Sequence, residues 1–326
     1  MIRTVVEDDR YEPDPAVLNT KDLITGRHVL FLFDYVGTPT LTRVLPLLKY
    51  YEDEQIVEVA PLTGADPQRK PPYDRYVFNI RASYRDEAQA LVDYFYRQGY
   101  RRIGFFGQAD AYGKSGEVAT AAALAKYGLK IVESVSYRRG TTFDADFRQQ
   151  VEILRSSAVD AIITFGVPGG CAGFIRDVRL AGWQVPVANV SFAGSDELLK
   201  VLLASSRRLN RDLTSRLITS EVVPSPSQFQ YPLVAKFRAV VSPESRNFVA
   251  LEGWLNATVV WEALKRMRTN GSRGDFVAAM ESLGGWDPGL GLKLTFSPSS
   301  HQGLHQVWLL RADPAAWIPL NPAATK

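Results

Sequence analysis

Two glycine-containing segments follow predicted strands and have residue types that could bind phosphate groups. The first, Gly166–Gly173, is rich in glycine, as in loops that contact a dinucleotide. It lacks the G-x-G-x-x-G order, however, and no acidic residue closes the next predicted strand. The second, Gly107–Ser115, has a Lys-Ser pair at the wrong spacing, with Tyr112 where a phosphate loop needs glycine. Neither segment therefore indicates nucleotide binding.

Few side chains could serve as a nucleophile or a metal ligand. Cys171 would need a nearby base, but no histidine lies in the loops that follow the predicted strands. We therefore expect Cys171 to be a small buried helix residue. His301 and His305 are four residues apart, but Gly303 between them favours a solvated turn over a helical metal site. We expect no catalytic residue, no metal and no cofactor.

Composition narrows the classes of partner. The 326 residues include 38 Lys+Arg and 35 Asp+Glu, a formal net charge of +3, and 46% of them are hydrophobic. A charge so close to neutral, without any block of five like charges, favours neither nucleic acid nor an anionic membrane. No apolar run approaches the ~18–20 residues of a membrane span, and the first residues do not follow a signal-peptide pattern.

Short apolar runs alternate with segments of helical spacing along most of the chain, which is typical of parallel sheets. The predicted strands are Thr4–Glu7, His28–Phe33, Ile56–Ala60, Tyr76–Ile80, Arg102–Gly107, Lys130–Ser136, Ala161–Phe165, Val185–Val190 and Leu217–Val222. The predicted helices are Asp14–Thr25, Leu41–Glu52, Arg85–Gln98, Lys114–Lys126, Ala145–Ser156, Cys171–Ala181, Asp196–Leu203, Pro232–Val241, Phe248–Met267 and Arg273–Leu283. A late antiparallel pair is expected from Gly291–Phe296 and Gln306–Arg311.

This succession predicts an α/β protein with two doubly wound parallel-sheet lobes joined by a multi-crossing hinge. We assign residues 1–107 and 226–284 to the first lobe, residues 108–225 and 285–318 to the second, and residues 319–326 to a tail.

The loops beyond the carboxyl ends of the strands are where an open parallel sheet binds its ligand. They are Asp34–Thr40, Pro61–Asp66, Gln108–Gly113, Gly166–Gly170 and Val190–Ser195. Three come from the first series of elements and two from the second. A solute that all five contact would lie in a cleft between the lobes, which could close on it.

Several motifs in this order resemble those of the type I periplasmic solute-binding proteins of the leucine/isoleucine/valine-binding family, the receptors of branched-chain amino acid ABC importers. The resemblance covers nearly the whole chain and is carried by Val6–Pro13, Gly37–Thr40, Ala60–Gly64, Asp110–Gly113 and Pro298–Gly303. It implies a protein that binds one small polar solute between two lobes and then docks on a membrane permease, without making or breaking a bond. It also implies a periplasmic or extracellular location and a monomer.

The resemblance assigns ligand contacts to five positions. Thr38 and Thr40 would hold a carboxylate through their hydroxyls and the nearby amides. Leu62 and Gly64 would contribute backbone contacts, and Tyr112 an aromatic wall. Two alternatives stay open: the threonines could simply cap a helix, and the tyrosine could pack at the lobe interface.

The chain departs from the family pattern at the second-lobe contacts. Ser191 stands where amino-acid-binding members place an acid for the ligand ammonium, and the family's second-lobe tyrosine falls at Val167 or Pro168. A buried ammonium without a partner would cost several kcal/mol. The ligand is therefore expected to be an amino acid derivative or another carboxylate rather than a free zwitterionic amino acid.

The beginning of the chain departs from the family as well. Family members start with a strand, a glycine-containing loop and a helix ahead of the segment that resembles Val5–Asp9. We therefore expect an N-terminally truncated form that lacks roughly 40 residues and a signal peptide. A ligand-sensing regulatory module of the same fold, without a transport role, is the alternative function.

Overall fold

The computed structural model describes residues 2–268, 271–313 and 316–320. These residues form two compact units. Unit 1 consists of the described residues of Met1–Ser83, Gln228–Arg246 and Ala250–His305, and unit 2 of those of Tyr84–Ser227, Asn247–Val249 and Gln306–Lys326. Within the described ranges, no helix combines the length and the apolar character needed to cross a membrane.

Unit 1 contains a short parallel sheet in the order β1-β2-β3. Its strands are β1 (Leu32–Phe33), β2 (Glu58–Val59) and β3 (Val77–Phe78), each shorter than the sequence predicted. Isolated bridges from Val36 to Leu62 and from Asn79 to Gln302 continue the pairing. The predicted strand Thr4–Glu7 is wrong, because no described residue pairs with this segment and a strand needs a neighbour for its backbone hydrogen bonds.

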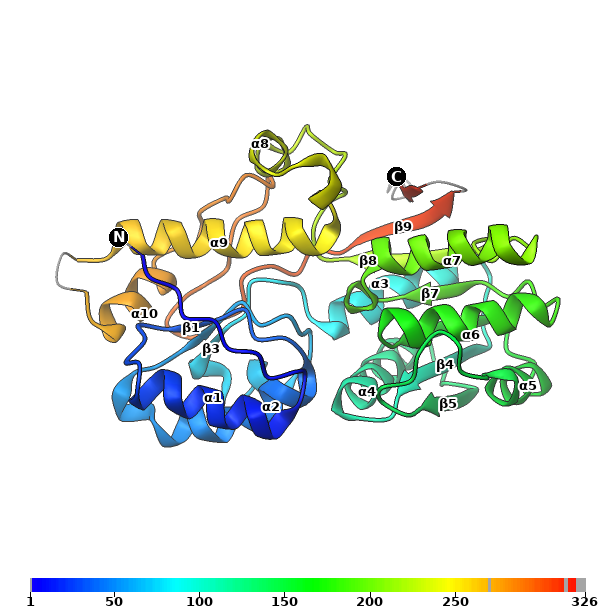
Figure 1. The fold of residues 1–326 in the computed structure, drawn as a ribbon, viewed down its shortest axis with the longest axis horizontal. Coiled ribbons are helices and arrows are strands. Elements are labelled where there is room, and N and C mark those ends of the chain that lie inside the picture. Colours follow the sequence, from blue (N-terminus) through cyan, green and yellow to red (C-terminus); the bar gives the residue numbers. More distant parts are fainter. Residues whose placement is uncertain (1, 269–270, 314–315, 321–326) are drawn as a thin grey trace. The chain divides into compact units, whose positions relative to one another are not determined.

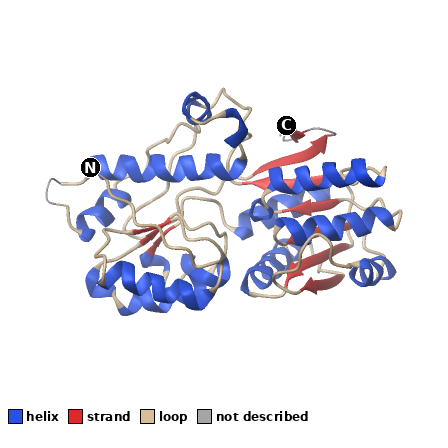
Figure 2. Cartoon of the chain, in the orientation of Figure 1, coloured by secondary structure: helices blue, strands red, loops and turns tan. Residues whose placement is uncertain are grey.

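Helices cover both sides of this sheet (Figures 1 and 2). They are α1 (Pro13–Thr25), α2 (Thr38–Tyr50), α9 (Phe248–Arg266) and α10 (Arg273–Glu281), while α8 (Pro232–Val240) lies on the side of α9 away from the sheet (Figure 1). Leu41, Val44, Leu45 and Leu48 recur at helical spacing on α2 and are fully buried. Their burial against α1 and Val77 forms the core of the unit.

Unit 2 contains a seven-stranded sheet in the order β10-β9-β8-β7-β6-β4-β5. Its strands are β4 (Ile103–Gln108), β5 (Glu133–Tyr137), β6 (Ala161–Phe165), β7 (Val187–Asn189), β8 (Leu217–Glu221), β9 (Trp308–Asp313) and β10 (Ala316–Pro319). Strands β4 to β8 pair in parallel, and β9 pairs antiparallel with β8 and β10.

Helices lie on both faces of the seven-stranded sheet (Figure 2). They are α3 (Tyr84–Arg97), α4 (Ala111–Ala125), α5 (Arg148–Ser156), α6 (Pro168–Leu180) and α7 (Ser195–Leu209). Helix α3 packs on α4, whereas α5 packs on α6 and α6 on α7. This is the doubly wound arrangement that the alternation of strands and helices predicts.

The predicted strand Gly291–Phe296 is wrong. In the structure its alternating pattern remains, because Leu294 and Phe296 are buried and Lys293 and Thr295 are exposed. The segment joins no ladder, however, since the Leu294 amide donates to the carbonyl oxygen of Trp286 and the Thr295 amide to that of Gly303. Strand β9 pairs instead with β8 and with the edge strand β10 in the sheet of unit 2.

The lobe boundaries expected from the sequence differ from the two units. Strand β4 and helix α3 were expected in the first lobe, but β4 pairs with β5 and β6 in unit 2, and α3 packs on α4. The described residues from 285 to 305 belong to unit 1, where Gln302 bridges Asn79. Pro319 ends β10 rather than beginning a tail, and 321–326 lie outside the described residues.

Candidate functional site

The loops that follow β1 and β2 lie side by side in unit 1. The Gly37 amide donates to the carbonyl oxygen of Leu62 (3.2 Å), and the Leu62 amide donates to that of Tyr35 (2.8 Å). Gly37 has a φ of 97°, which glycine adopts readily, and a β-carbon there would collide with the Tyr11 ring. Two of the predicted loops are therefore brought together by backbone hydrogen bonds.

The two predicted threonine hydroxyls are buried in this arrangement. The Thr38 Oγ1 lies 2.7 Å from the Thr63 Oγ1, and the Thr40 hydroxyl donates to the carbonyl oxygen of Gly37 (2.8 Å). Helix α2 begins at Thr38, with Gly37 as its N-cap and no capping side chain. The alternative in which these threonines cap the helix is therefore wrong. Gly64 is buried in the same loop as Thr63.

The predicted contacts of unit 2 follow three adjacent strands, β4, β6 and β7. Tyr112 lies in the first turn of α4, Pro168 begins α6, and Ser191 begins a short 3-10 helix. The ring of Phe192 lies 4.7 Å from that of Tyr112 between centroids. A β-carbon on Gly194 would lie 3.4 Å from Pro168. The structure therefore brings these three loops together at the carboxyl ends of the strands.

Tyr112 is fully buried in an aromatic cluster of unit 2. Its ring centroid lies 5.4 Å from that of Tyr84 and 5.8 Å from that of Phe165. Burial raises the pKa of its phenol well above the ordinary value. No described residue forms a hydrogen bond with its hydroxyl group. A buried hydroxyl without a partner is unfavourable, so this atom is suited to a hydrogen bond with a ligand or a water molecule.

The segment at Val167 is held by a hydrogen-bond chain from neighbouring strands. The Val167 amide donates to the Tyr137 hydroxyl (2.9 Å), which donates to the Gln108 Oε1 (3.3 Å). Helix α6 begins at Pro168, three residues earlier than predicted.

Cys171 lies in the first turns of α6 and is fully buried, as expected. Burial raises the pKa of its thiol to about 12. A thiol in this state is not an activated nucleophile.

Ser191 is bound to a buried carboxylate that the sequence did not reveal. Its amide donates to the Glu87 Oε2 (2.9 Å) and its hydroxyl to the Glu87 Oε1 (3.0 Å). The Ser220 hydroxyl also donates to Oε2 (2.7 Å), so Glu87 connects α3, β8 and the loop after β7. In the sequence, Glu87 is one of two acids in the first turn of a helix, a position where acids are common, and nothing marks it as buried.

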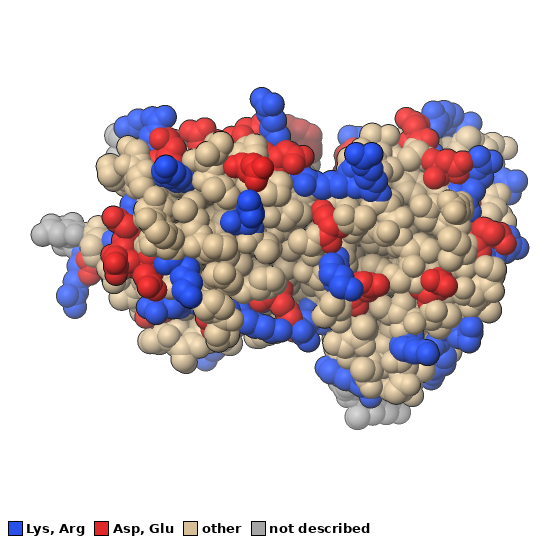
Figure 3. All heavy atoms as spheres, turned by 90° about the horizontal axis from the view of Figure 1, so that it is seen from below, with Lys and Arg blue, Asp and Glu red and all other residues tan. Residues whose placement is uncertain are grey.

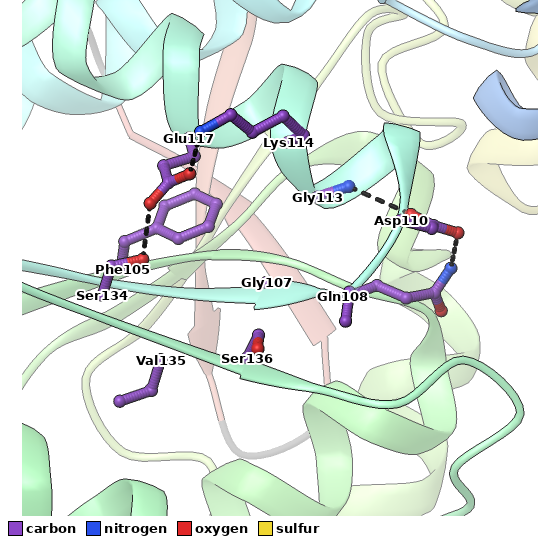
Figure 4. Close-up of a pocket in the computed structure, with 11 residues that line it drawn as sticks. Phe105, Gly107, Gln108, Asp110, Gly113, Lys114, Glu117, Ser134, Val135 and Ser136 are labelled. Atoms are coloured by element: carbon purple, nitrogen blue, oxygen red, sulfur yellow. Dashed lines mark hydrogen bonds and ion pairs between the residues drawn. The ribbon is translucent and has the colours of Figure 1, made fainter.

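A pocket of about 300 Å³ lies along α4, the edge strand β5 and its neighbour β4 (Figure 4). Asp110 lies at one end, where its Oδ1 accepts from the Tyr112 and Gly113 amides and its Oδ2 from the Gln108 side chain (2.6 Å). Glu117 lies at the other end, bonded to Lys114 and Ser134. The polar residues of the predicted loop therefore line this pocket, while Tyr112 does not.

The expectation of a solvated turn at His301 is wrong. His301 is 8% exposed, its ring stacks on Phe78 at 3.7 Å, and its Nε2 lies 3.2 Å from the Glu281 Oε1. Burial lowers the pKa of its imidazole. The turn folds inward because the Gly303 amide donates to the Asn79 carbonyl oxygen. His305, in contrast, is exposed.

In the part of the chain that the structure describes, no three His, Cys, Asp or Glu residues could hold a metal ion together.

Two α/β units, each with flanking helices and with loops gathered beyond the ends of its parallel strands, form a two-domain architecture suited to binding a small ligand. A family model described as periplasmic binding protein matches residues 1–316. The chain therefore belongs to the periplasmic binding protein family, as its motifs implied, and its fold is that of the type I members. Proteins of this family bind solutes and are not enzymes.

Solved structures with the same fold come from several bacteria. A possible leucine/isoleucine/valine-binding protein from Rhodopirellula baltica SH 1 has a TM-score of 0.85 and 29% identity, covering 96% of this chain and 83% of its own. A substrate-binding periplasmic protein from Ralstonia solanacearum has a TM-score of 0.84 and 26% identity, with coverages of 96% and 86%. A branched chain amino acid ABC transporter protein from Thermus thermophilus with bound valine has a TM-score of 0.80 and 18% identity, with coverages of 97% and 84%. No curated protein matches the chain.

Proposed function

We propose that this protein is the substrate-binding component of a branched-chain-amino-acid-type ABC importer. It binds a small polar organic solute, an amino acid derivative or another carboxylate, through the loops that follow the strands of its two sheets. The observation that carries the proposal is the convergence of the loops after β4, β6 and β7 at one end of the unit 2 sheet, in a chain of this family. Thr38, Thr40, Leu62 and Gly64 contribute from unit 1, and Tyr112, Val167, Pro168 and Ser191 from unit 2.

The chemistry of these loops favours a carboxylate. Helix α6 begins in this region without a side-chain cap, and the amides of a helix N-terminus attract negative charge. The Tyr112 hydroxyl needs an acceptor, which a carboxylate oxygen supplies.

A free ammonium group finds less support. Ser191 stands where the resemblance to amino-acid-binding members implies an acid, and the Glu87 carboxylate beside it already accepts three hydrogen bonds from Ser191 and Ser220. An N-acylated amino acid would avoid the cost of a desolvated ammonium. The protein would deliver its solute to permease subunits from the periplasm or the cell exterior, where its relatives function.

The test is a thermal-shift and calorimetric comparison of leucine, valine, N-acetyl-leucine and isovalerate. A ligand present at 100 times its dissociation constant stabilises the folded state by about 2.7 kcal/mol. We expect N-acetyl-leucine or isovalerate to raise the melting temperature more than leucine does. If none of the four compounds raises it, the proposed function is wrong.

Tyr112→Phe sharpens the test because it should raise the stability of the ligand-free protein and lower its affinity for the ligand. Removal of the unpartnered hydroxyl should stabilise the ligand-free protein by about 1 kcal/mol. The same change should weaken ligand binding about fivefold, because the ligand loses a hydrogen bond. Tyr50→Phe, at a tyrosine that is 78% exposed, is the matched control and should change neither quantity. Unchanged affinity in Tyr112→Phe would remove this residue from the ligand contacts.

A further inference from the structure

A second cavity, of about 620 Å³, lies in unit 1 and contains none of the predicted ligand residues. Its volume falls in the ~300–1,000 Å³ range of small-molecule sites. Its walls come from one face of α9, from α8 and from the loop before Leu290. The Leu233 amide donates to the carbonyl oxygen of Gly289 (3.0 Å), which fixes that loop to α8. Figure 1 shows α8 next to α9, and the Phe237 and Trp254 rings, 6.2 Å apart, join the two helices.

The cavity is rich in tryptophan. Of the six tryptophans in the chain, three line it: Trp254, Trp261 and Trp286. Trp254 and Trp261 are seven residues apart on α9, as are Thr258 and Lys265, so this helix presents one continuous face to the cavity. Trp261 is 56% exposed. A large aromatic side chain that is half in water is poorly explained by packing alone and indicates a contact surface for an apolar molecule.

Two hydrogen-bond donors of the cavity have no partner among the described residues. The buried Trp254 Nε1 has no hydrogen-bond partner among the described residues. Within the same described ranges, no ion pair involves Lys236. The unpartnered indole N–H favours a ligand that brings an acceptor atom, and the exposed Lys236 ammonium is available to pair with a negative charge.

The acidic groups of the cavity are already engaged. Glu262 accepts from Lys265 and from the Arg266 Nε (3.2 Å), and the Lys265 ammonium lowers the pKa of this carboxyl. The Asp287 Oδ1 accepts from the Gly289 and Leu290 amides at 2.7 and 2.8 Å. Glu262 is therefore neutralised by two cations, and one oxygen of Asp287 is held by backbone amides.

We propose that this cavity is a second small-molecule site, which binds a flat apolar molecule carrying a carboxylate. The tryptophan rings contact the apolar body of the ligand, and the Lys236 ammonium and the Trp254 Nε1 bind its carboxylate. This site goes beyond the proposed transport function and does not depend on it, because the two sets of residues share no member.

The experiment titrates 2-naphthoate into the full chain, with binding followed by calorimetry and by quenching of tryptophan fluorescence. We expect saturable binding of one molecule at this site. Lys236→Gln should weaken it about tenfold, because a hydrogen bond to a charged group is lost. Trp254→Phe, which keeps a ring but removes the N–H, should weaken it about fivefold. Uncharged 2-naphthamide should bind the wild type about as weakly as 2-naphthoate binds Lys236→Gln.

The matched controls are Lys49→Gln, at an exposed lysine of α2, and Trp183→Phe in unit 2, neither of which should change the affinity. The proposal is overturned if 2-naphthoate does not saturate, or if Lys236→Gln and Trp254→Phe both leave its affinity unchanged. It is also overturned if Thr38→Val abolishes the binding while Lys236→Gln does not, because the probe would then occupy the transport site. Unfolding curves for each variant separate a lost contact from a lost fold.

Discussion

Glu58 is a buried carboxyl group on strand β2 whose ionisation opposes folding. It is fully buried, its Oε1 accepts the Tyr35 amide (3.0 Å), and its Oε2 has no hydrogen-bond partner among the described residues. Burial raises its pKa well above the ordinary 4.5, and the nearby Asp34 carboxylate raises it further. In the folded protein, Glu58 therefore holds its proton at pH values where the unfolded chain releases it.

The consequence is a stability that falls with pH. Because the pKa of Glu58 is higher in the folded state, its favourable contribution is complete below about pH 4.5 and is lost as the pH rises through the folded value. We expect the stability of Glu58→Gln relative to wild type to increase from pH 4.5 upward. Urea unfolding of both proteins at several pH values measures this difference. A difference that stays constant with pH would contradict the interpretation, and Glu7→Gln, at an exposed glutamate, is the control.

The Glu87 carboxylate on α3 holds the loop of Ser191 by accepting hydrogen bonds from Ser191, and it also accepts one from Ser220 on β8. Glu87→Met keeps a similar side-chain volume but removes every acceptor, which leaves the buried Ser191 amide without its partner. We expect a loss of about 2–3 kcal/mol in the free energy of unfolding. Chemical denaturation measures it, with Glu152→Met on the exposed face of α5 as the control. Equal stability of the two variants would show that the hydrogen bonds to Glu87 contribute little.

The start of helix α4 depends on one capping residue. Asp110 accepts from the Tyr112 amide (2.9 Å) and the Gly113 amide (3.2 Å), which lack partners within the helix. Gly113 must lack a β-carbon, because that atom would lie 1.9 Å from the carbonyl oxygen of Gln108. Together they place Tyr112 in the first turn and direct its ring into the core.

Asp110→Ala should therefore destabilise the protein by about 1 kcal/mol, whereas Asp110→Asn should cost much less because asparagine also caps helices. Thermal unfolding of both variants tests this order. Asp144→Ala, at an exposed turn, is the control. Equal losses for Asp110→Ala and Asp110→Asn would indicate that the carboxylate charge, rather than the cap, matters here.

The strands of unit 2 match the sequence prediction more closely than the strands of unit 1, whereas the unit 1 helices α1, α8, α9 and α10 begin and end within two residues of their predicted bounds. Strand β6 begins and ends as predicted, because a continuous apolar run buried on both faces has a clear sequence pattern. In unit 1 the strands shrink to two residues, and the alternating segment Gly291–Phe296 forms none. Alternation reports which side chains are buried, but a strand also requires a free neighbouring edge, and the local sequence does not encode that edge.

Across the whole chain, charge is balanced and dispersed. The formal net charge is +3, and on the face drawn in Figure 3 acidic and basic side chains are interspersed without a broad patch of either sign. Such a surface gives no strong long-range field. Long-range electrostatic attraction therefore contributes little to the approach of a charged ligand to this face.

The sequence by itself determined the α/β class, the family and which loops follow the strands, because these follow from local periodicity and from motifs in a fixed order. Only the tertiary structure decided which of those residues have partners: the Thr38 hydroxyl meets Thr63, Ser191 meets Glu87, and the Tyr112 hydroxyl has no described partner. It also gathered three tryptophans and Lys236 around one cavity. The physical reason is that hydrogen bonds and cavities join residues far apart in the chain, and their pairing depends on packing that no local pattern records.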